Sequence, residues 1–132
     1  MQLNADLSRL RQQLWRAYAA LAPTLRQLQR GEPMVQGSFY LLRRKCGKPT
    51  CRCATGQLHP AWVLTRSEQG KDRLYTIPKE ERSRLRKLAA EYRRYHRARA
   101  VLVKRHLNLL ALVDAMAQKR LLLWPQKKTP PD

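Results

Sequence analysis

Residues 43–60 read RRKCGKPTCRCATGQLHP, and this stretch holds all three cysteines of the chain. Cys46, Cys51, Cys53 and His59 give the spacing C-x4-C-x-C-x5-H, and cysteine sulfur and histidine nitrogen are ligands that zinc prefers. Glycine and proline residues between them let the backbone wrap around an ion. The sequence therefore predicts a tetrahedral Cys3His zinc site in a loop that we call the knuckle, residues 46–59.

Such a site is expected to be structural, because four protein ligands leave no coordination position for water. Two alternatives stay open for the ligands. Either the cysteines are reduced thiols in a tight turn that His59 caps, or the loop folds back so that His96 or His106 replaces His59. Three cysteines so close together cannot link distant elements, which favours a reduced, cytoplasmic protein.

An enzymatic interpretation rests on Cys46 and Arg52, whose C-x5-R spacing also occurs where a thiolate and an arginine share a phosphate-binding loop. The residues after Arg52 do not resemble the start of a helix, and Asp72 is the only obvious acid nearby. The nine acidic residues also show no metal-binding cluster of the kind that nucleases use. We therefore expect a protein that is not an enzyme.

The segments that flank the knuckle favour strands. Residues 36–45 precede it, and residues 61–66 and 73–77 are rich in β-branched and aromatic side chains. Residues 67–71, Ser-Glu-Gln-Gly-Lys, read as a hairpin turn between the last two. The sequence predicts a small three-stranded antiparallel sheet, with the knuckle, over residues 36–77.

Apolar residues at alternating spacings of three and four predict a helix on each side of the sheet. The first covers residues 4–30, bends at Pro23 and ends at Gly31. The second covers residues 79–121 and is basic. Its seam comprises Leu85, Leu88, Tyr92, Tyr95, Leu102, Leu109, Val113 and Met116. The predicted fold is α+β, with the two long helices forming an antiparallel coiled pair, within one chain or across a dimer. It makes one domain, residues 1–123, followed by a disordered tail, residues 124–132.

The charge of the chain points to a polyanionic partner. Its 132 residues include 28 lysines and arginines against 9 acidic residues, a formal net charge of +19. Apolar residues make up 43% of the chain, too many for a disordered basic tail. The longest apolar stretch, residues 109–117, is far shorter than the ~20 residues that span a bilayer. The N-terminus also lacks the pattern of a signal peptide. Nucleic acid is therefore the expected partner, with no membrane association.

Two groups of basic residues are the candidate phosphate contacts. The first, which we call the basic cluster, surrounds the knuckle and comprises Arg43, Arg44, Lys45, Lys48 and Arg52. The second lies on the predicted C-terminal helix, where acidic partners are scarce, and comprises Arg86, Arg93, Arg94, Arg97, Lys104 and Arg105. Four sheet aromatics either stack on unpaired bases or form core beneath the helices: Phe39, Tyr40, Trp62 and Tyr75.

The stretch also resembles a known family. The residues CGKP at 46–49, CRCATG at 51–56, His59, Gly70-Lys71 and Ile77-Pro78-Lys79 resemble a family of small prokaryotic proteins described only as a domain of unknown function. Its pattern is CGKPxCxCxxGxxHGP, and this chain departs from it at Pro60-Ala61. The resemblance covers residues 37–100. It implies a cysteine-rich, nucleic-acid-associated protein that often occurs with mobile elements, and no established reaction.

These observations predict an accessory or architectural protein that binds DNA. RNA binding is the close alternative, because no helix-turn-helix or RNA-recognition motif distinguishes the two. The other alternative is an assembly adaptor that binds a protein partner through its coiled helices. Unpaired apolar side chains favour that alternative at Leu109, Leu110, Leu112, Val113 and residues 121–124.

Overall fold

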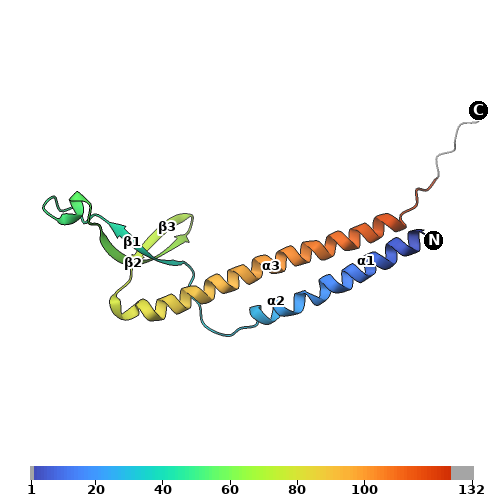
Figure 1. Ribbon diagram of the computed structural model, residues 1–132, viewed down its shortest axis with the longest axis horizontal. Helices are drawn as coiled ribbons and strands as arrows, with labels where there is room; N and C mark the ends of the chain where they lie inside the picture. The colour runs from blue at the N-terminus through green and yellow to red at the C-terminus, as the bar shows by residue number, and fades with distance from the viewer. Residues whose placement is uncertain (1, 126–132) are drawn as a thin grey trace, which may run out of the picture. The chain divides into compact units, whose positions relative to one another are not determined.

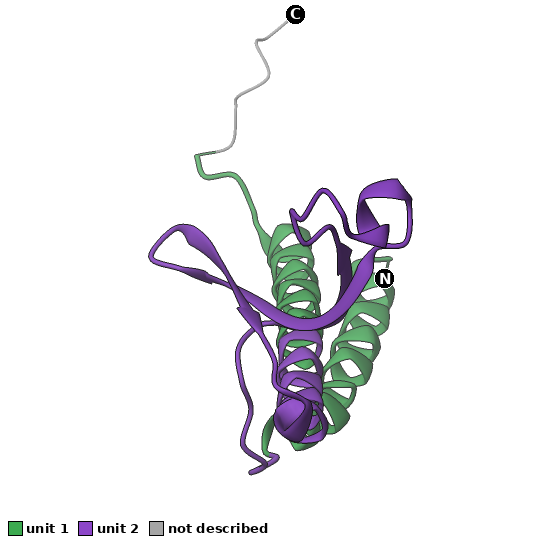
Figure 2. Cartoon of the chain, turned by 90° about the vertical axis from the view of Figure 1, so that its left-hand side faces the viewer, with its two compact units in different colours: residues 1–29, 98–132 green, residues 30–97 purple. Residues whose placement is uncertain are grey.

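The computed structural model describes residues 2–125, which divide into two units. Unit 1 comprises residues 1–29 and 98–132, and unit 2 comprises residues 30–97 (Figure 2). One long helix, α3 (Arg82–Arg120), contributes to both units. One domain over residues 1–123 stays a prediction, and the predicted tail lies outside the described residues from residue 126 onward.

Unit 2 is built on a three-stranded antiparallel sheet in the order β1 (Ser38–Arg44), β2 (His59–Glu68) and β3 (Lys71–Thr76), shown in Figure 1. The hairpin between β2 and β3 turns at Gln69 and Gly70, whose φ angles are 51° and 79°. Two consecutive positive φ angles are typical of the tight turn that matches the twist of paired strands. The predicted α+β fold with a three-stranded antiparallel sheet is confirmed.

The two faces of this sheet differ. Residues opposite one another in the ladder share a face, and neighbours along a strand alternate. The helix-side face carries Phe39, Trp62 and Leu64. Leu64 is buried with Ile77 and with Ala89 of α3, and Phe39 and Trp62 pack against this small core. The other face, which we call the open face, carries Tyr40, Leu42 and Arg44 of β1. Opposite Ser38 and Tyr40 it also carries Thr65 and Val63 of β2 and Leu74 and Thr76 of β3.

The segment of unit 2 that precedes β1 is tied to the first turns of α3. Arg30 donates two hydrogen bonds to Glu91, at 2.9 and 3.3 Å, and the backbone N–H of Val35 donates to the carbonyl of Leu88 at 3.1 Å. Before α3, residues 79–81 form a 3-10 turn after Pro78. The predicted helix over residues 79–121 therefore begins with a tighter turn and ends one residue early, at Arg120.

Unit 1 contains α1 (Gln2–Ala19), α2 (Leu21–Leu28) and the C-terminal half of α3. The helix predicted over residues 4–30 with a bend at Pro23 is interrupted at Ala20, between α1 and α2. Pro23 has no N–H to donate to the carbonyl of Ala19, and its ring crowds that carbonyl, so α1 ends there. Pro23 lies instead in the first turn of α2, where the missing donor costs little.

Few side chains in unit 1 are buried. Leu7 of α1 and Thr24 of α2 are buried, and Asp6 of α1 pairs with Lys119 of α3 at 3.6 Å. These contacts place parts of α1 and of the end of α3 beside each other, whereas a coiled pairing stays a prediction. Across residues 2–125, none of the helices combines the length and the apolar character that crossing a membrane would require.

Candidate metal centre

The sheet brings the two ends of the knuckle together. Arg44, the last residue of β1, pairs with His59, the first residue of β2. The loop between them folds on itself: the backbone N–H of Cys51 donates to the carbonyl of Lys48 at 3.2 Å, and residues 52–55 form a 3-10 turn. Strand register therefore fixes where Cys46 and His59 lie, and the 3-10 turn positions Cys51 and Cys53 between them.

The four predicted ligands converge. The ligand atoms of Cys46, Cys51, Cys53 and His59 all lie within 4.8 Å of one another. The sulfurs of Cys46 and Cys53 are 3.4 Å apart, and the sulfur of Cys51 is 3.0 Å from Nε2 of His59. A zinc–sulfur bond of about 2.3 Å sets sulfur atoms at the corners of a tetrahedron about 3.8 Å apart. The donor set and its spacing therefore fit a four-coordinate metal ion, with His59 as the nitrogen ligand.

The local environment favours ionised sulfur at one ligand. Backbone hydrogen bonding from Cys53, followed by a hydrogen bond with His59, lowers the pKa of Cys51 to about 6. For Cys53, hydrogen bonding from the backbone N–H of Cys46 lowers the pKa, but burial and the neighbouring sulfurs outweigh it and raise the pKa overall. Cys53 is only 1% exposed. A metal cation is the natural counter-charge for sulfur atoms held this close together.

The profile of the family described as domain of unknown function DUF6788 matches residues 4–87. The chain belongs to this family. The match covers α1, α2, the sheet, the candidate metal centre and the first turns of α3. No curated protein matches the chain. No solved structure matches it either. The resemblance to a family of unknown function is confirmed, and the association with mobile elements stays a prediction.

In this DUF6788 protein the basic cluster surrounds the metal centre. Arg43 and Arg44 end β1, while Lys45, Lys48 and Arg52 lie in or next to the knuckle, and all five are exposed. None of them forms an ion pair with another residue of the described range 2–125. Arg44 donates one hydrogen bond, to the hydroxyl of Thr76 at 3.4 Å. The positive charge of the cluster is therefore available to an anion.

The candidate phosphate contacts on α3 differ in the unit to which they belong and in whether they have partners within the protein. Arg86, Arg93, Arg94 and Arg97 belong to unit 2, whereas Lys104 and Arg105 belong to unit 1. The guanidinium of Arg86 lies 4.9 Å from the ring centre of Trp62 and 5.4 Å from that of Phe39, and Arg94 pairs with Glu91 at 2.6 Å. These two arginines therefore have structural partners. Arg93, Arg97 and Lys104 are exposed, and Arg105 is half-buried.

The aromatic residues of the sheet also differ in whether they have partners within the protein. Phe39 and Trp62 stack at 5.2 Å between ring centres and pack on the core, and the hydroxyl of Tyr75 donates to Glu68 at 2.6 Å. Tyr40 is the one left exposed on the open face. It borders a hollow that was not predicted from the sequence. Period-two alternation within the three strands is the signal that would have placed its polar lining residues on one face.

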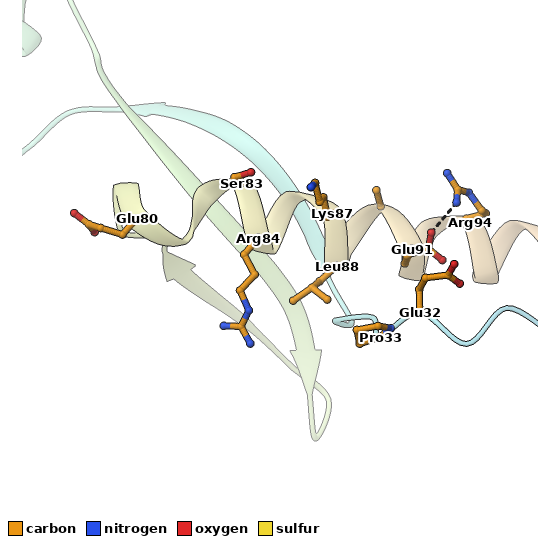
Figure 3. A pocket seen from close by; sticks show the side chains of 10 residues that line it. Glu32, Pro33, Glu80, Ser83, Arg84, Lys87, Leu88, Glu91 and Arg94 are labelled. Atoms are coloured by element: carbon orange, nitrogen blue, oxygen red, sulfur yellow. Dashed lines mark hydrogen bonds and ion pairs between the residues drawn. The ribbon is translucent and has the colours of Figure 1, made fainter.

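A second hollow, of about 760 Å³, lies between the segment before β1 and the first turns of α3 (Figure 3). Its charged lining is balanced: the acids are Glu32, Glu80 and Glu91, and the basic residues are Arg84, Lys87 and Arg94. Glu91 already binds Arg94 and Arg30. The lining has no net charge to attract a polyanion, and its ion pairs hold the segment onto α3.

Proposed function

We propose that this protein binds one structural zinc ion through Cys46, Cys51, Cys53 and His59, and that the ordered knuckle grips the phosphates of nucleic acid. The observation that carries the proposal is the convergence of four soft ligand atoms within 4.8 Å, inside a loop ringed by unpaired basic side chains. The metal orders the loop, and the loop presents the charge.

The knuckle has little else to order it. Cys53 is the only buried residue among residues 45–58, all of which the structure describes. Burial of one small side chain contributes far less than the roughly 10–16 kcal/mol with which zinc-finger peptides bind their ion. The Cys3His set closes the coordination shell, so the ion supplies folding energy and no catalysis. A reducing compartment, as in the cytoplasm, keeps the three thiols available.

Nucleic acid suits the charge of the knuckle. Each phosphate that a lysine or arginine neutralises releases bound counterions and strengthens binding at low salt. Contacts to phosphate carry little sequence information, so an accessory or architectural role with weak sequence preference follows. DNA is favoured, with RNA as the alternative, and service to a mobile element is the setting that the family resemblance implies.

Metal content tests the first half of the proposal. Protein purified without added metal is expected to carry about one zinc per chain by elemental mass spectrometry. Cys51→Ser and His59→Gln should each lower that content, whereas His96→Gln, which changes a histidine that packs beside Tyr92 in α3, should leave it unchanged. Zinc retained in both ligand variants would refute the assignment.

An assembly role is the second candidate, and exposed apolar side chains in unit 1 favour it. Leu110 and Val113 of α3 are exposed, and Leu122 and Trp124 are 89% and 90% exposed. Leu109 and Leu112, in contrast, are half-buried. Light scattering across a range of protein concentrations tests whether these side chains pair two copies. A constant monomer mass would argue against the homodimer.

A further inference from the structure

Among the residues that the structure describes, Tyr40 on the open face makes no ring–ring or cation–π contact, unlike the aromatic residues of the helix-side face. On the helix-side face Arg86 covers Phe39 and Trp62, and Arg66 lies 5.1 Å from the ring centre of Tyr75. On the open face Tyr40 is 39% exposed and Leu74 is 44% exposed. They lie on the two outer strands, offset by two residues, which places their backbones about 12 Å apart across β2.

Between them lies a hollow of about 480 Å³. Its lining on the open face consists of Tyr40 and Leu74 together with Ser38, Thr65, Ser67 and Asp72, and Arg66 and Arg73 border it. The ladder explains the grouping, because Ser38, Thr65 and Leu74 are directly opposite one another, as are Ser67 and Asp72. The site therefore combines one aromatic ring, one aliphatic side chain, four hydroxyls including that of Tyr40, one carboxylate and, at its border, the guanidinium groups of Arg66 and Arg73.

Asp72 makes this hollow a poor phosphate site. Arg66 and Arg73, its neighbours in the hairpin, both pair with Glu68 on the helix-side face, at 2.6 and 3.9 Å. Asp72 forms no ion pair with any residue that the structure describes. An unpaired carboxylate repels phosphate, but it accepts hydrogen bonds from the amino and imino groups of bases. A flat ring with N–H groups at its edge fits this chemistry.

We propose that the hollow between Tyr40 and Leu74 binds an unpaired nucleobase, and that the ligand of this protein is therefore single-stranded nucleic acid. Tyr40 stacks on the base, Leu74 packs at its other edge, and Asp72 with the neighbouring hydroxyls reads its N–H groups. A base-paired duplex keeps the faces of its bases stacked and its ring N–H groups paired, so none of its bases can stack on Tyr40.

The proposal rests on the proposed function, because the same face leads to the basic cluster. Arg44 lies four residues beyond Tyr40 in β1, on the same face, about 14 Å away at the rise of an extended strand. Its partner in the ladder, His59, is a candidate metal ligand. One strand of nucleic acid can thus place a base over Tyr40 while its phosphates reach Arg44 and the knuckle.

The test compares oligonucleotides of equal length and charge that carry or lack bases. Fluorescence anisotropy would measure the affinity of the zinc-loaded protein for oligodeoxycytidylate, for the RNA strand oligocytidylate and for an abasic deoxyribose-phosphate oligomer. We expect tighter binding of both base-bearing strands, and the two strands rank DNA against RNA. Tyr40→Ala should cost roughly five- to 150-fold for the base-bearing strands and almost nothing for the abasic one. Tyr40→Phe should keep the preference, and Tyr18→Ala, which alters an exposed tyrosine of unit 1, is the matched control.

The variant Asp72→Asn distinguishes hydrogen bonding to bases from a simple effect of charge on affinity. Removal of a negative charge should strengthen binding of the abasic oligomer. If Asp72 accepts hydrogen bonds from bases, the same change should reduce the ratio of base-bearing to abasic affinity. Two results would overturn the base site and leave the proposed function standing. One is equal affinity for all oligomers. The other is an unchanged affinity of Tyr40→Ala for every oligomer, while removal of the basic cluster weakens binding of each. Failure to bind any oligomer would overturn both.

Discussion

Removal of three of the five residues of the basic cluster should change how strongly binding depends on salt. In the variant Arg43→Ala, Arg44→Ala and Lys45→Ala, three exposed charges that lack acidic partners are lost. Each phosphate contact contributes about 0.7 to the slope of log affinity against log salt for single strands and about 0.9 for duplex DNA. If all three residues contact phosphate, the slope should become shallower by about 2 units for a single strand.

That change is large enough to measure. Between about 50 and 200 mM salt, a difference of 2 units in slope corresponds to a roughly 20-fold smaller loss of affinity in the variant than in the wild type. Anisotropy titrations at several salt concentrations give the slope directly. The control removes the same number of charges from exposed positions of α1 and α2 in unit 1, through Arg11→Ala, Arg16→Ala and Arg26→Ala. It should lower affinity modestly while leaving the slope nearly unchanged.

The control decides the interpretation. If both triple variants change the slope equally, net charge rather than the basic cluster governs binding. If neither variant changes the slope, the basic cluster does not contact phosphate, and the proposed nucleic-acid interface is refuted. Zinc content and circular dichroism of both variants would show that the knuckle and the helices remain formed.

Three further predictions concern the fold that supports the site. Gly37→Ala should destabilise the protein by about 1–3 kcal/mol in chemical denaturation. Gly37 has φ of 142°, and an added Cβ would lie 2.8 Å from a carbonyl oxygen of β2. Wild-type stability of this variant would contradict the close approach. Ile77→Ala should cost about 2–5 kcal/mol, because Ile77 is buried in the small core beneath the sheet, and a loss below 1 kcal/mol would mean that this core contributes little. Hydrogen bonds from Tyr75 and Arg66 lower the pKa of Glu68 from its ordinary 4.5, so the stability that this carboxylate contributes is present above about pH 4.5 and is lost as the pH falls through the lowered pKa. Glu68→Gln should therefore reduce the loss of folding stability at acidic pH. An unchanged loss would mean that other carboxylates cause it.

The sheet and the converging ligands were predictable because local signals agree with the tertiary fold. β-branched and aromatic runs placed the strands, and Gly70 readily adopts the positive φ that a tight hairpin turn needs. The ladder that follows forces Arg44 beside His59, so one histidine near the cysteines in sequence is also near them in space. For this reason the spacing of residues 46–59 was sufficient to predict that the four candidate ligands converge.

Other features depended on information that the sequence pattern does not display. Heptad spacing continues through Pro23, so the pattern alone favoured one helix, whereas the missing N–H of proline divides it into α1 and α2. Arg86 looked like a phosphate contact, but the packing of α3 places it over Trp62. The hollow beside Tyr40 arises from three strands at once, and only their register brings Ser38, Thr65 and Asp72 to one face.

The most direct test of the central claim is the affinity of one zinc-loaded preparation for a single-stranded oligonucleotide, measured before chelation, after chelation and after zinc is restored. The account predicts that chelation weakens binding and makes the salt slope shallower, because the knuckle no longer holds the basic cluster in place, and that zinc restores both values. Unchanged affinity and slope after complete removal of the metal would contradict it.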